Sequence, residues 1–198
     1  MVVAKRFYLL MLRSVKVEKS KVKEEVKSWI KSLVIAFAVV FLVRTFLFAP
    51  YTVDGSSMSP TLHNHEKMFV SKMNFIGDFK RGDIVIIKGD GTDTNYVKRI
   101  IGTPGDQIEM SNDQLLINGK VYDEPYLSEN RKQAKQQGSL LTGNFGPLTV
   151  PDDQYFVMGD NRLDSMDSRN GLGYIQKDHI IGKAKFVFYP FDSFRGVE

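Results

Sequence analysis

The sequence predicts a mainly β protein, in which an antiparallel β-sheet domain follows one N-terminal transmembrane helix. Three observations predict this class. The first 31 residues carry nine basic and three acidic residues. A long apolar run then extends from Trp29 to Ala49. After Pro50 the chain consists of short segments rich in β-branched and aromatic residues, separated by Gly, Pro, Asn and Asp, and such segments are typical of strands.

Composition and charge exclude several kinds of site. The 198 residues include no cysteine, which excludes disulfides, thiolate catalysis and cysteine-bound zinc or iron–sulfur centres. The net charge is +4, but the first 31 residues contribute +6, so the remaining 167 residues carry −2. Because the positive charge belongs to the N-terminal arm, we expect no nucleic-acid partner.

The apolar run has the length of a membrane span. Its 21 residues, Trp29 to Ala49, would form a helix of about 31 Å, close to the roughly 30 Å hydrocarbon thickness of a bilayer. Lys31 and Arg44 lie near its ends, where basic side chains reach the headgroups. The positive-inside rule then places the N-terminus in the cytoplasm and the chain after Pro50 outside the plasma membrane.

These features predict a cytoplasmic basic arm (1–28), a single transmembrane helix (29–49) and an extracytoplasmic β-rich domain (50–198). A cleaved secretory signal peptide and a buried core helix are the alternatives for the apolar run. The basic arm is long for a signal peptide, and Leu47 is too large for the minus 3 position of a cleavage site after Ala49.

The β-rich part contains six predicted strands and one hairpin. The strands are 67–72, 83–88, 95–101, 107–110, 154–158 and 180–189. The hairpin joins 115–117 to 120–122 through Asn118-Gly119, a pair suited to the two positive φ angles of a type I′ turn. Residues 128–146 are polar and rich in Gln and Lys, so we expect a mobile surface excursion there.

A serine-rich turn follows the apolar run, reading VDGSSMSPTL from Val53 to Leu62. Gly55 permits backbone N–H groups to approach a substrate carbonyl, which suits an exposed serine nucleophile. Serine-rich turns also commonly bond only their own backbone, so this segment alone supports either interpretation.

The predicted strand from Tyr96 to Ile101 carries a lysine among bulky neighbours. Alternation places Lys98 between Tyr96 and Ile100 on one face. Partial burial lowers the pKa of a lysine and makes it a general base near neutral pH. A solvated lysine on an edge strand is the alternative.

A third segment, from Met158 to Arg169, reads MGDNRLDSMDSR. Its Gly-Asp-Asn turn and two Asp-x-Arg spacings indicate a hydrogen-bonded loop, although a solvated polar loop has the same composition.

An apolar anchor, the GSSMSPTL turn, the YVKRIIGTPGD strand and turn, and the GDNRLDSMDSR loop occur in that order. This arrangement resembles the bacterial type I signal peptidases, or leader peptidases, in their compact Gram-positive form, from the apolar run to about Phe191. The resemblance implies a membrane-bound serine endopeptidase without cofactor or metal. Its substrates would be the signal peptides of secretory preproteins, cut after a small residue at minus 1 (Ala-x-Ala sites).

Site roles follow from the same resemblance. Ser57 would be the nucleophile and Lys98 the general base, a Ser-Lys dyad, with the Ser165 hydroxyl orienting the lysine. The Ser57 N–H would be one oxyanion donor. Some relatives place a second hydroxyl donor where this chain has Gly55, so a main-chain group or Ser56 would have to serve.

Two further groups of residues surround this dyad. Those assigned to structural ion pairs are Arg99, Asp160, Asp167 and Arg169. Those assigned to substrate binding, with ordinary core packing as the alternative, are Val53, Met58, Leu62, Tyr96 and Val97. Leu163 and Asp164 depart from some relatives, which have Asp and Asn there.

Other interpretations are weaker. His63-Asn64-His65 lacks a third metal ligand, and His179 would be needed for a Ser-His-Asp triad. Self-cleaving repressors also use Ser and Lys but carry a DNA-binding helix-turn-helix. A pseudo-peptidase that binds exported chains without cutting them is the non-enzymatic alternative. The expected partners are therefore signal peptides and the lipid bilayer, with the protein acting as a monomer.

Overall fold

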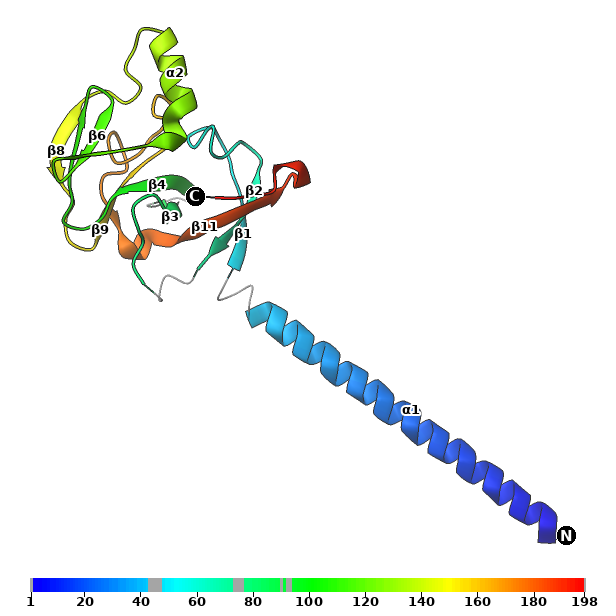
Figure 1. Cartoon of the computed structure of the whole chain (residues 1–198). Helices are drawn as coiled ribbons and strands as arrows, with labels where there is room; N and C mark the ends of the chain where they lie inside the picture. The colour runs from blue at the N-terminus through cyan, green and yellow to red at the C-terminus, as the bar shows by residue number, and fades with distance from the viewer. Residues whose placement is uncertain (1, 43–47, 73–76, 90, 92–93, 198) are drawn as a thin grey trace. The chain divides into compact units, whose positions relative to one another are not determined.

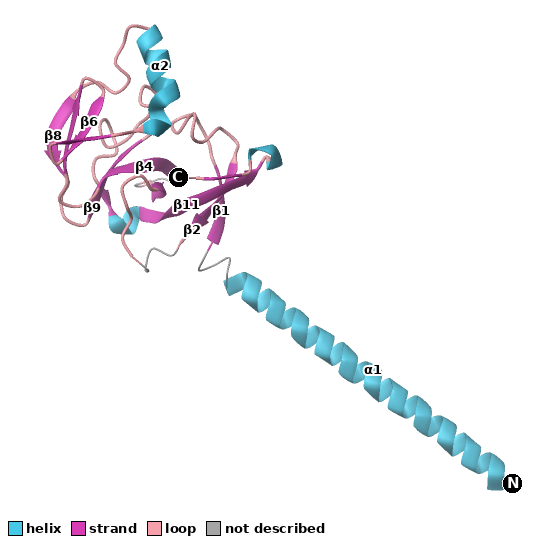
Figure 2. Ribbon diagram, viewed as in Figure 1, coloured by secondary structure: helices cyan, strands magenta, loops and turns pink. Residues whose placement is uncertain are grey.

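The computed structural model describes residues 2–42, 48–72, 77–89, 91 and 94–197, and side chains from residue 22 onward, except residues 43–48. It divides into two compact units, Met1–Thr45 and Phe46–Glu198. The first unit is one helix, α1 (Val2–Leu42), and the second contains all the strands (Figures 1 and 2).

Helix α1 includes both the basic arm and the beginning of the apolar run. No helix within the described residues has the length and apolarity needed to cross a membrane. The predicted span 29–49 also covers residues 43–47, which lie outside the described residues. Its last two residues are wrongly assigned, because Phe48–Thr52 forms strand β1, in which Ala49 pairs with Val70.

The second unit contains two antiparallel sheets. The larger has eight strands in the order β1-β2-β11-β3-β4-β9-β10, with β12 paired to β11. Its strands are β1, β2 (Lys67–Ser71), β3 (Ile84–Lys88), β4 (Asn95–Gly102), β9 (Gln154–Met158), β10 (Ile175–Gln176), β11 (Ile180–Tyr189) and β12 (Arg195–Gly196). The smaller sheet follows the order β7-β6-β5-β8. Its strands are β5 (Gln107–Ser111), β6 (Gln114–Ile117), β7 (Lys120–Tyr122) and β8 (Phe145–Thr149).

The mainly antiparallel β class is therefore confirmed, and so are the six predicted strands, with their ends shifted by one residue at most. The predicted hairpin is confirmed as well. Asn118 and Gly119 have φ angles of 53° and 74° between β6 and β7, as the turn requires.

The expected polar excursion at 128–146 is wrong. It contains helix α2 (Ser128–Gln136), which follows the short 3-10 helix Pro125–Leu127, and its end enters β8. Leu127, Ala134 and Leu141 are each at most 2% exposed and pack together. Their seven-residue spacing gives the segment a narrow buried face despite its polar composition.

Candidate functional site

The structure brings Ser57 and Lys98 together. Ser57 lies half-buried in the turn after β1, and Lys98 lies on β4, an internal strand between β3 and β9. The Lys98 Nζ and the Ser57 Oγ are 2.8 Å apart, a hydrogen bond between residues 41 positions apart in sequence. Lys98 is only 2% exposed. The alternative of a solvated lysine on an edge strand is therefore wrong.

Burial lowers the pKa of Lys98 to about 8, whereas its ordinary value is 10.5. The negative charges of Asp167 and Asp160 raise the pKa and offset part of this effect, and the positive charge of Arg169 lowers it further. At mildly alkaline pH much of Lys98 is therefore neutral. A neutral amine beside a hydroxyl can accept the hydroxyl proton, which is the first requirement for an activated serine.

Of the three expected oxyanion donors, Gly55, Ser56 and Ser57, the first two already donate hydrogen bonds to other residues. Gly55 has φ +97°, and its N–H donates to Asn64 Oδ1 at 2.9 Å. The Ser56 hydroxyl donates to Asp164 Oδ2 at 2.7 Å. The Ser57 N–H makes no hydrogen bond to any described residue. This geometry favours the Ser57 N–H, and the roles of Gly55 and Ser56 stay predictions.

Ser165 lies in the loop that follows β9 and is 7% exposed. Its Oγ makes no hydrogen bond of normal geometry within the described part of the chain, so the expected bond to Lys98 is not made, although the hydroxyl lies close enough to the Asp167 carboxylate to help lower the pKa of that group. A Cβ on Gly159 would lie 2.3 Å from this Oγ and 2.4 Å from the Ser57 carbonyl oxygen. Gly159 therefore allows the Ser165 hydroxyl and the Ser57 turn to approach one another, and the orienting role of Ser165 stays a prediction.

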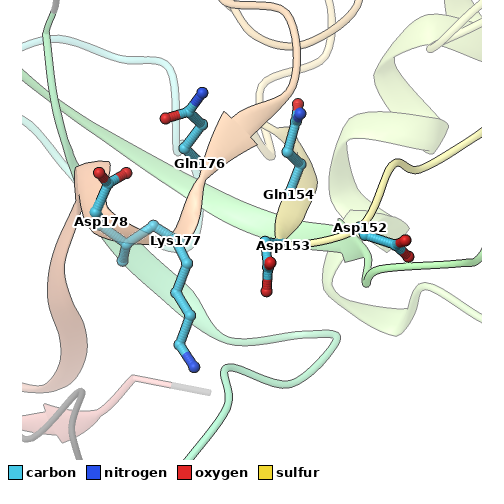
Figure 3. Close-up of a pocket in the computed structure, with 7 residues that line it drawn as sticks. Asp152, Asp153, Gln154, Gln176, Lys177 and Asp178 are labelled. Carbon is cyan, nitrogen blue, oxygen red and sulfur yellow. The ribbon is translucent and has the colours of Figure 1, made fainter.

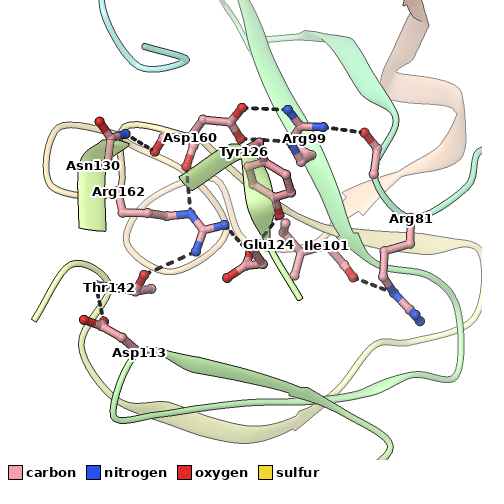
Figure 4. A network of polar contacts seen from close by, with 12 residues as sticks. Arg81, Arg99, Ile101, Asp113, Glu124, Tyr126, Asn130, Thr142, Asp160 and Arg162 are labelled. Carbon is pink, nitrogen blue, oxygen red and sulfur yellow. Dashed lines mark hydrogen bonds and ion pairs between the residues drawn. The ribbon is translucent and has the colours of Figure 1, made fainter. Parts of the chain in front are cut away.

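Two ion pairs hold the loop after β9. Arg99 Nε and Nη2 donate to the two carboxylate oxygens of Asp160, at 2.9 and 2.7 Å, and both residues are at most 2% exposed (Figure 4). Thr61 Oγ1 donates to the same carboxylate at 2.5 Å. Arg169 pairs with the fully buried Asp167 at 2.8 Å. The ion pairs assigned from the sequence are thus present, and the first joins β4 to this loop.

The Asp167 carboxylate also accepts a hydrogen bond from the Gly159 N–H, at 3.0 Å. Burial alone raises the pKa of Asp167, but the guanidinium of Arg169 and this N–H lower it below its ordinary value. The carboxylate therefore stays ionised and keeps Gly159 in place.

A second polar cluster was missed by sequence reasoning. Glu124 is fully buried and accepts hydrogen bonds from Arg162 Nη2 at 2.5 Å and Tyr126 Oη at 2.8 Å (Figure 4). Arg131 adds a further ion pair to Glu124 at 3.2 Å. The Arg99 guanidinium lies 3.9 Å from the centre of the Tyr126 ring, which links this cluster to the Arg99–Asp160 pair. No local sequence signal identifies it, because Glu124 and Arg162 are 38 residues apart.

The predicted substrate-binding residues lie in two different clusters. Val53, Met58 and Leu62 are at most 3% exposed and pack in one cluster, with the partly buried Val97 against it. Tyr96 packs against another cluster. Such burial is what the core-packing alternative expects for the first three, and the pocket assignments stay predictions.

A surface pocket of about 630 Å³ lies beside β9 and β10, and neither Ser57 nor Lys98 lines it (Figure 3). Its lining residues are Asp152, Asp153, Gln154, Gln176, Lys177, Asp178 and Ile180. None of them is a predicted site residue. Among the described residues, no group of three or more His, Asp or Glu side chains is arranged to hold a metal ion.

Comparison with known proteins identifies the family. Residues 26–189 match the family model described as "Signal peptidase, peptidase S26". Signal peptidase I S of Bacillus subtilis is 59% identical over 175 residues, which are 87% of this chain and 94% of that protein. A signal peptidase I of Bacillus amyloliquefaciens is 57% identical over 179 residues, or 90% and 96% of the two chains.

A crystal structure of a signal peptidase I from Enterococcus faecalis is 33% identical, covers 54% of this chain and 97% of its own, and gives a TM-score of 0.49. The family match and the Bacillus relatives extend over most of the chain. The sequence therefore belongs to the signal peptidase family, peptidase S26, and is a serine endopeptidase of the signal peptidase I type.

Proposed function

We propose that this protein cleaves signal peptides from secreted preproteins at Ala-x-Ala type sites, with Ser57 as nucleophile and Lys98 as general base. The observation that carries the proposal is the 2.8 Å contact between Lys98 Nζ and Ser57 Oγ, made by a lysine that is 98% buried and has a lowered pKa. A buried amine aimed at a serine hydroxyl has no evident structural purpose, since burial of its charge opposes folding.

The reaction follows from this pair. Neutral Lys98 accepts the Ser57 proton while Ser57 Oγ attacks the carbonyl carbon of the residue at minus 1. The oxyanion that forms accepts a hydrogen bond from the Ser57 N–H. Lys98 then gives its proton to the leaving amine, which departs with the mature protein. Finally Lys98 activates a water molecule that hydrolyses the ester on Ser57 and releases the signal peptide.

The remaining assignments support this chemistry. Arg99, Asp160, Asp167 and Arg169 fix the loop beside the dyad, and Ser165 orients Lys98 once its hydroxyl, which is not bonded to the lysine in this structure, turns toward it. The substrate lies as an extended strand beside the segments around Val53 and Val97.

The charge pattern supports the proposed topology. The basic arm 1–28 lies in the cytoplasm, the apolar run that begins at Trp29 crosses the plasma membrane, and the β domain, whose first strand β1 begins at Phe48, acts outside as a monomer. Cleavage sites then emerge close to Ser57, which is only nine positions after Phe48 in the sequence.

The test uses the full-length protein in detergent with a precursor that carries an Ala-x-Ala site. Mass spectrometry of the products should show one cut, after the alanine at minus 1. Replacing that alanine with phenylalanine should stop cleavage, whereas the same change at plus 2 should not. Cleavage at unrelated positions, or no cleavage at all, would contradict the proposed specificity.

The pH dependence of kcat/KM should follow Lys98. Protonated Lys98 has no lone pair to accept the Ser57 proton, so kcat/KM should rise about tenfold per pH unit below pH 8 and level off above it, given that its pKa is about 8. A His179→Asn variant should show the same profile. A profile with its midpoint near the ordinary histidine pKa of about 6.5, lost in that variant, would replace the dyad with a histidine mechanism.

Replacing Gly159 with alanine should lower both stability and kcat. The new Cβ would meet the Ser57 carbonyl and the Ser165 side chain at 2.3 to 2.7 Å, so the Ser57 turn must shift. Such overpacking costs about 1–3 kcal/mol, and we expect kcat to fall by more than about tenfold because the nucleophile moves. Gly196→Ala is the matched control, since nothing lies within 4 Å of its added Cβ. Equal activity of the two variants would show that the turn tolerates the shift.

A further inference from the structure

Helix α2 sends one side chain to both the Ser57 turn and the loop after β9. Asn130, in the first half of the helix, donates from Nδ2 to the Asp160 carbonyl oxygen at 2.8 Å (Figure 4). The same Nδ2 donates to the Ser59 carbonyl oxygen at 3.0 Å. Ser59 follows Ser57 by two positions, and Asp160 follows Gly159. One planar amide group therefore holds both loops.

The same two loops also bond directly. Asn161 N–H donates to the Ser57 carbonyl oxygen at 3.0 Å, and its side chain donates to the Ser56 carbonyl oxygen at 3.2 Å. With the bond from Asn130, the main-chain carbonyl oxygens of Ser56, Ser57 and Ser59 all accept hydrogen bonds, the first two from the loop after β9 and the third from helix α2. Any change in the spacing of the loops moves Ser57 Oγ relative to Lys98, which is fixed on β4.

The helix that carries Asn130 is itself anchored. Ala134 is buried against Leu127 and Leu141, and Arg131 pairs with the buried Glu124. The segment after the helix is held to the smaller sheet, because the carboxylate of Asp113 accepts the N–H groups of Leu141 and Thr142 at 2.7 and 2.8 Å. The Asn130 amide therefore projects from a fixed support.

We propose that Asn130 is a positioning residue, which sets the spacing between the Ser57 turn and the loop after β9 and so the alignment of Ser57 with Lys98. The inference rests on the proposed function of the dyad. Its role is separate from helix formation, since alanine is a better helix former than asparagine and Asn130→Ala should leave α2 intact.

Three variants of the full-length protein in detergent test this role on the Ala-x-Ala precursor. Asn130→Ala removes both donors, and we expect kcat to fall about 10- to 100-fold with KM changed less than about twofold, as for a misplaced nucleophile. Asn130→Asp places a carboxylate against two carbonyl oxygens and should lower kcat further. Gln133→Ala, an exposed amide on the same helix, should match wild type.

The pH profile separates positioning from loss of folded protein. If Ser57 moves away from Lys98, water reaches the amine and the midpoint of kcat/KM shifts upward from about 8 toward the ordinary lysine value. The midpoint does not depend on how much enzyme is folded. An Asn130→Ala protein with the wild-type kcat, or with a reduced kcat and an unshifted midpoint, would overturn the inference. Activity that persists in Ser57→Ala would instead overturn the proposed dyad.

Discussion

A Lys98→Met protein should be inactive and more stable than wild type. Loss of the general base should lower kcat/KM by about 10²–10⁴-fold. Methionine fills a similar volume and buries no charge. Burial lowers the pKa of Lys98 from 10.5 to about 8, and each unit corresponds to about 1.4 kcal/mol, so the wild-type protein loses about 3–4 kcal/mol at pH 7 by burying this amine.

The size of this stability advantage depends on pH. Below pH 8 Lys98 is protonated in both the folded and the unfolded chain, and the full cost of its buried charge is present. Between pH 8 and 10.5 only the unfolded chain holds the proton, so wild-type stability rises with pH. The advantage of Lys98→Met should therefore be largest at pH 7 and disappear near pH 10.5.

Thermal unfolding of the full-length proteins in detergent, at pH 7 and pH 10, measures this advantage. Ser57→Ala is the control, because it should be equally inactive but keeps the buried amine; it also removes the hydroxyl bonded to Lys98 Nζ, so it should be no more stable than wild type. Lys98→Met should therefore melt above Ser57→Ala at pH 7, and the difference between the two should narrow at pH 10. A Lys98→Met protein no more stable than wild type at pH 7 would contradict the lowered pKa of Lys98, because that value already includes the opposing charges of Asp167 and Asp160.

Local signals explain what the sequence predicted well. The strands and the Asn118-Gly119 hairpin depend on alternation and turn residues within a few positions, and the structure has them where they were expected. Ser57 and Lys98 are 41 residues apart, and no local rule joins them. They were found together only because their flanking motifs resemble those of a known family.

Tertiary contacts explain what was missed. Helix α2 was read as a polar excursion because only Ala134 within it is buried, and one buried alanine gives a weak helical period. Glu124 and Arg162 pair because the fold buries both side chains beside one another, and their spacing in the sequence gives no sign of the contact. The same holds for Arg195, which lies beyond the matched residues 26–189 and pairs with Glu66 at 2.7 and 2.8 Å. Such ion-pair partners can be identified only from the folded structure.

Asp160→Ala should be among the most destabilising single changes in the domain. It leaves the Arg99 guanidinium, 2% exposed, without either carboxylate bond and removes the acceptor of Thr61 Oγ1. Removing one partner of a buried ion pair costs about 3–5 kcal/mol, since an uncompensated charge stays buried. Cleavage should fall with stability, because the loop after β9 loses its attachment to β4.

The double variant Arg99→Met/Asp160→Leu separates the cost of the unpaired charge from the value of the pair. Apolar replacements of both partners leave no buried charge, so the double variant should be more stable than Asp160→Ala even though it changes more residues. Arg99 also donates to the Gly82 carbonyl oxygen at 2.9 Å, and that bond is lost in the double variant alone. Urea unfolding of the wild-type protein, of Arg99→Met, Asp160→Leu and Asp160→Ala, and of the double variant measures these stabilities and the coupling. A double variant less stable than Asp160→Ala would contradict this prediction, and would mean that the other contacts of Arg99, with Gly82 and Tyr126, stabilise the fold more than its unpaired charge destabilises it.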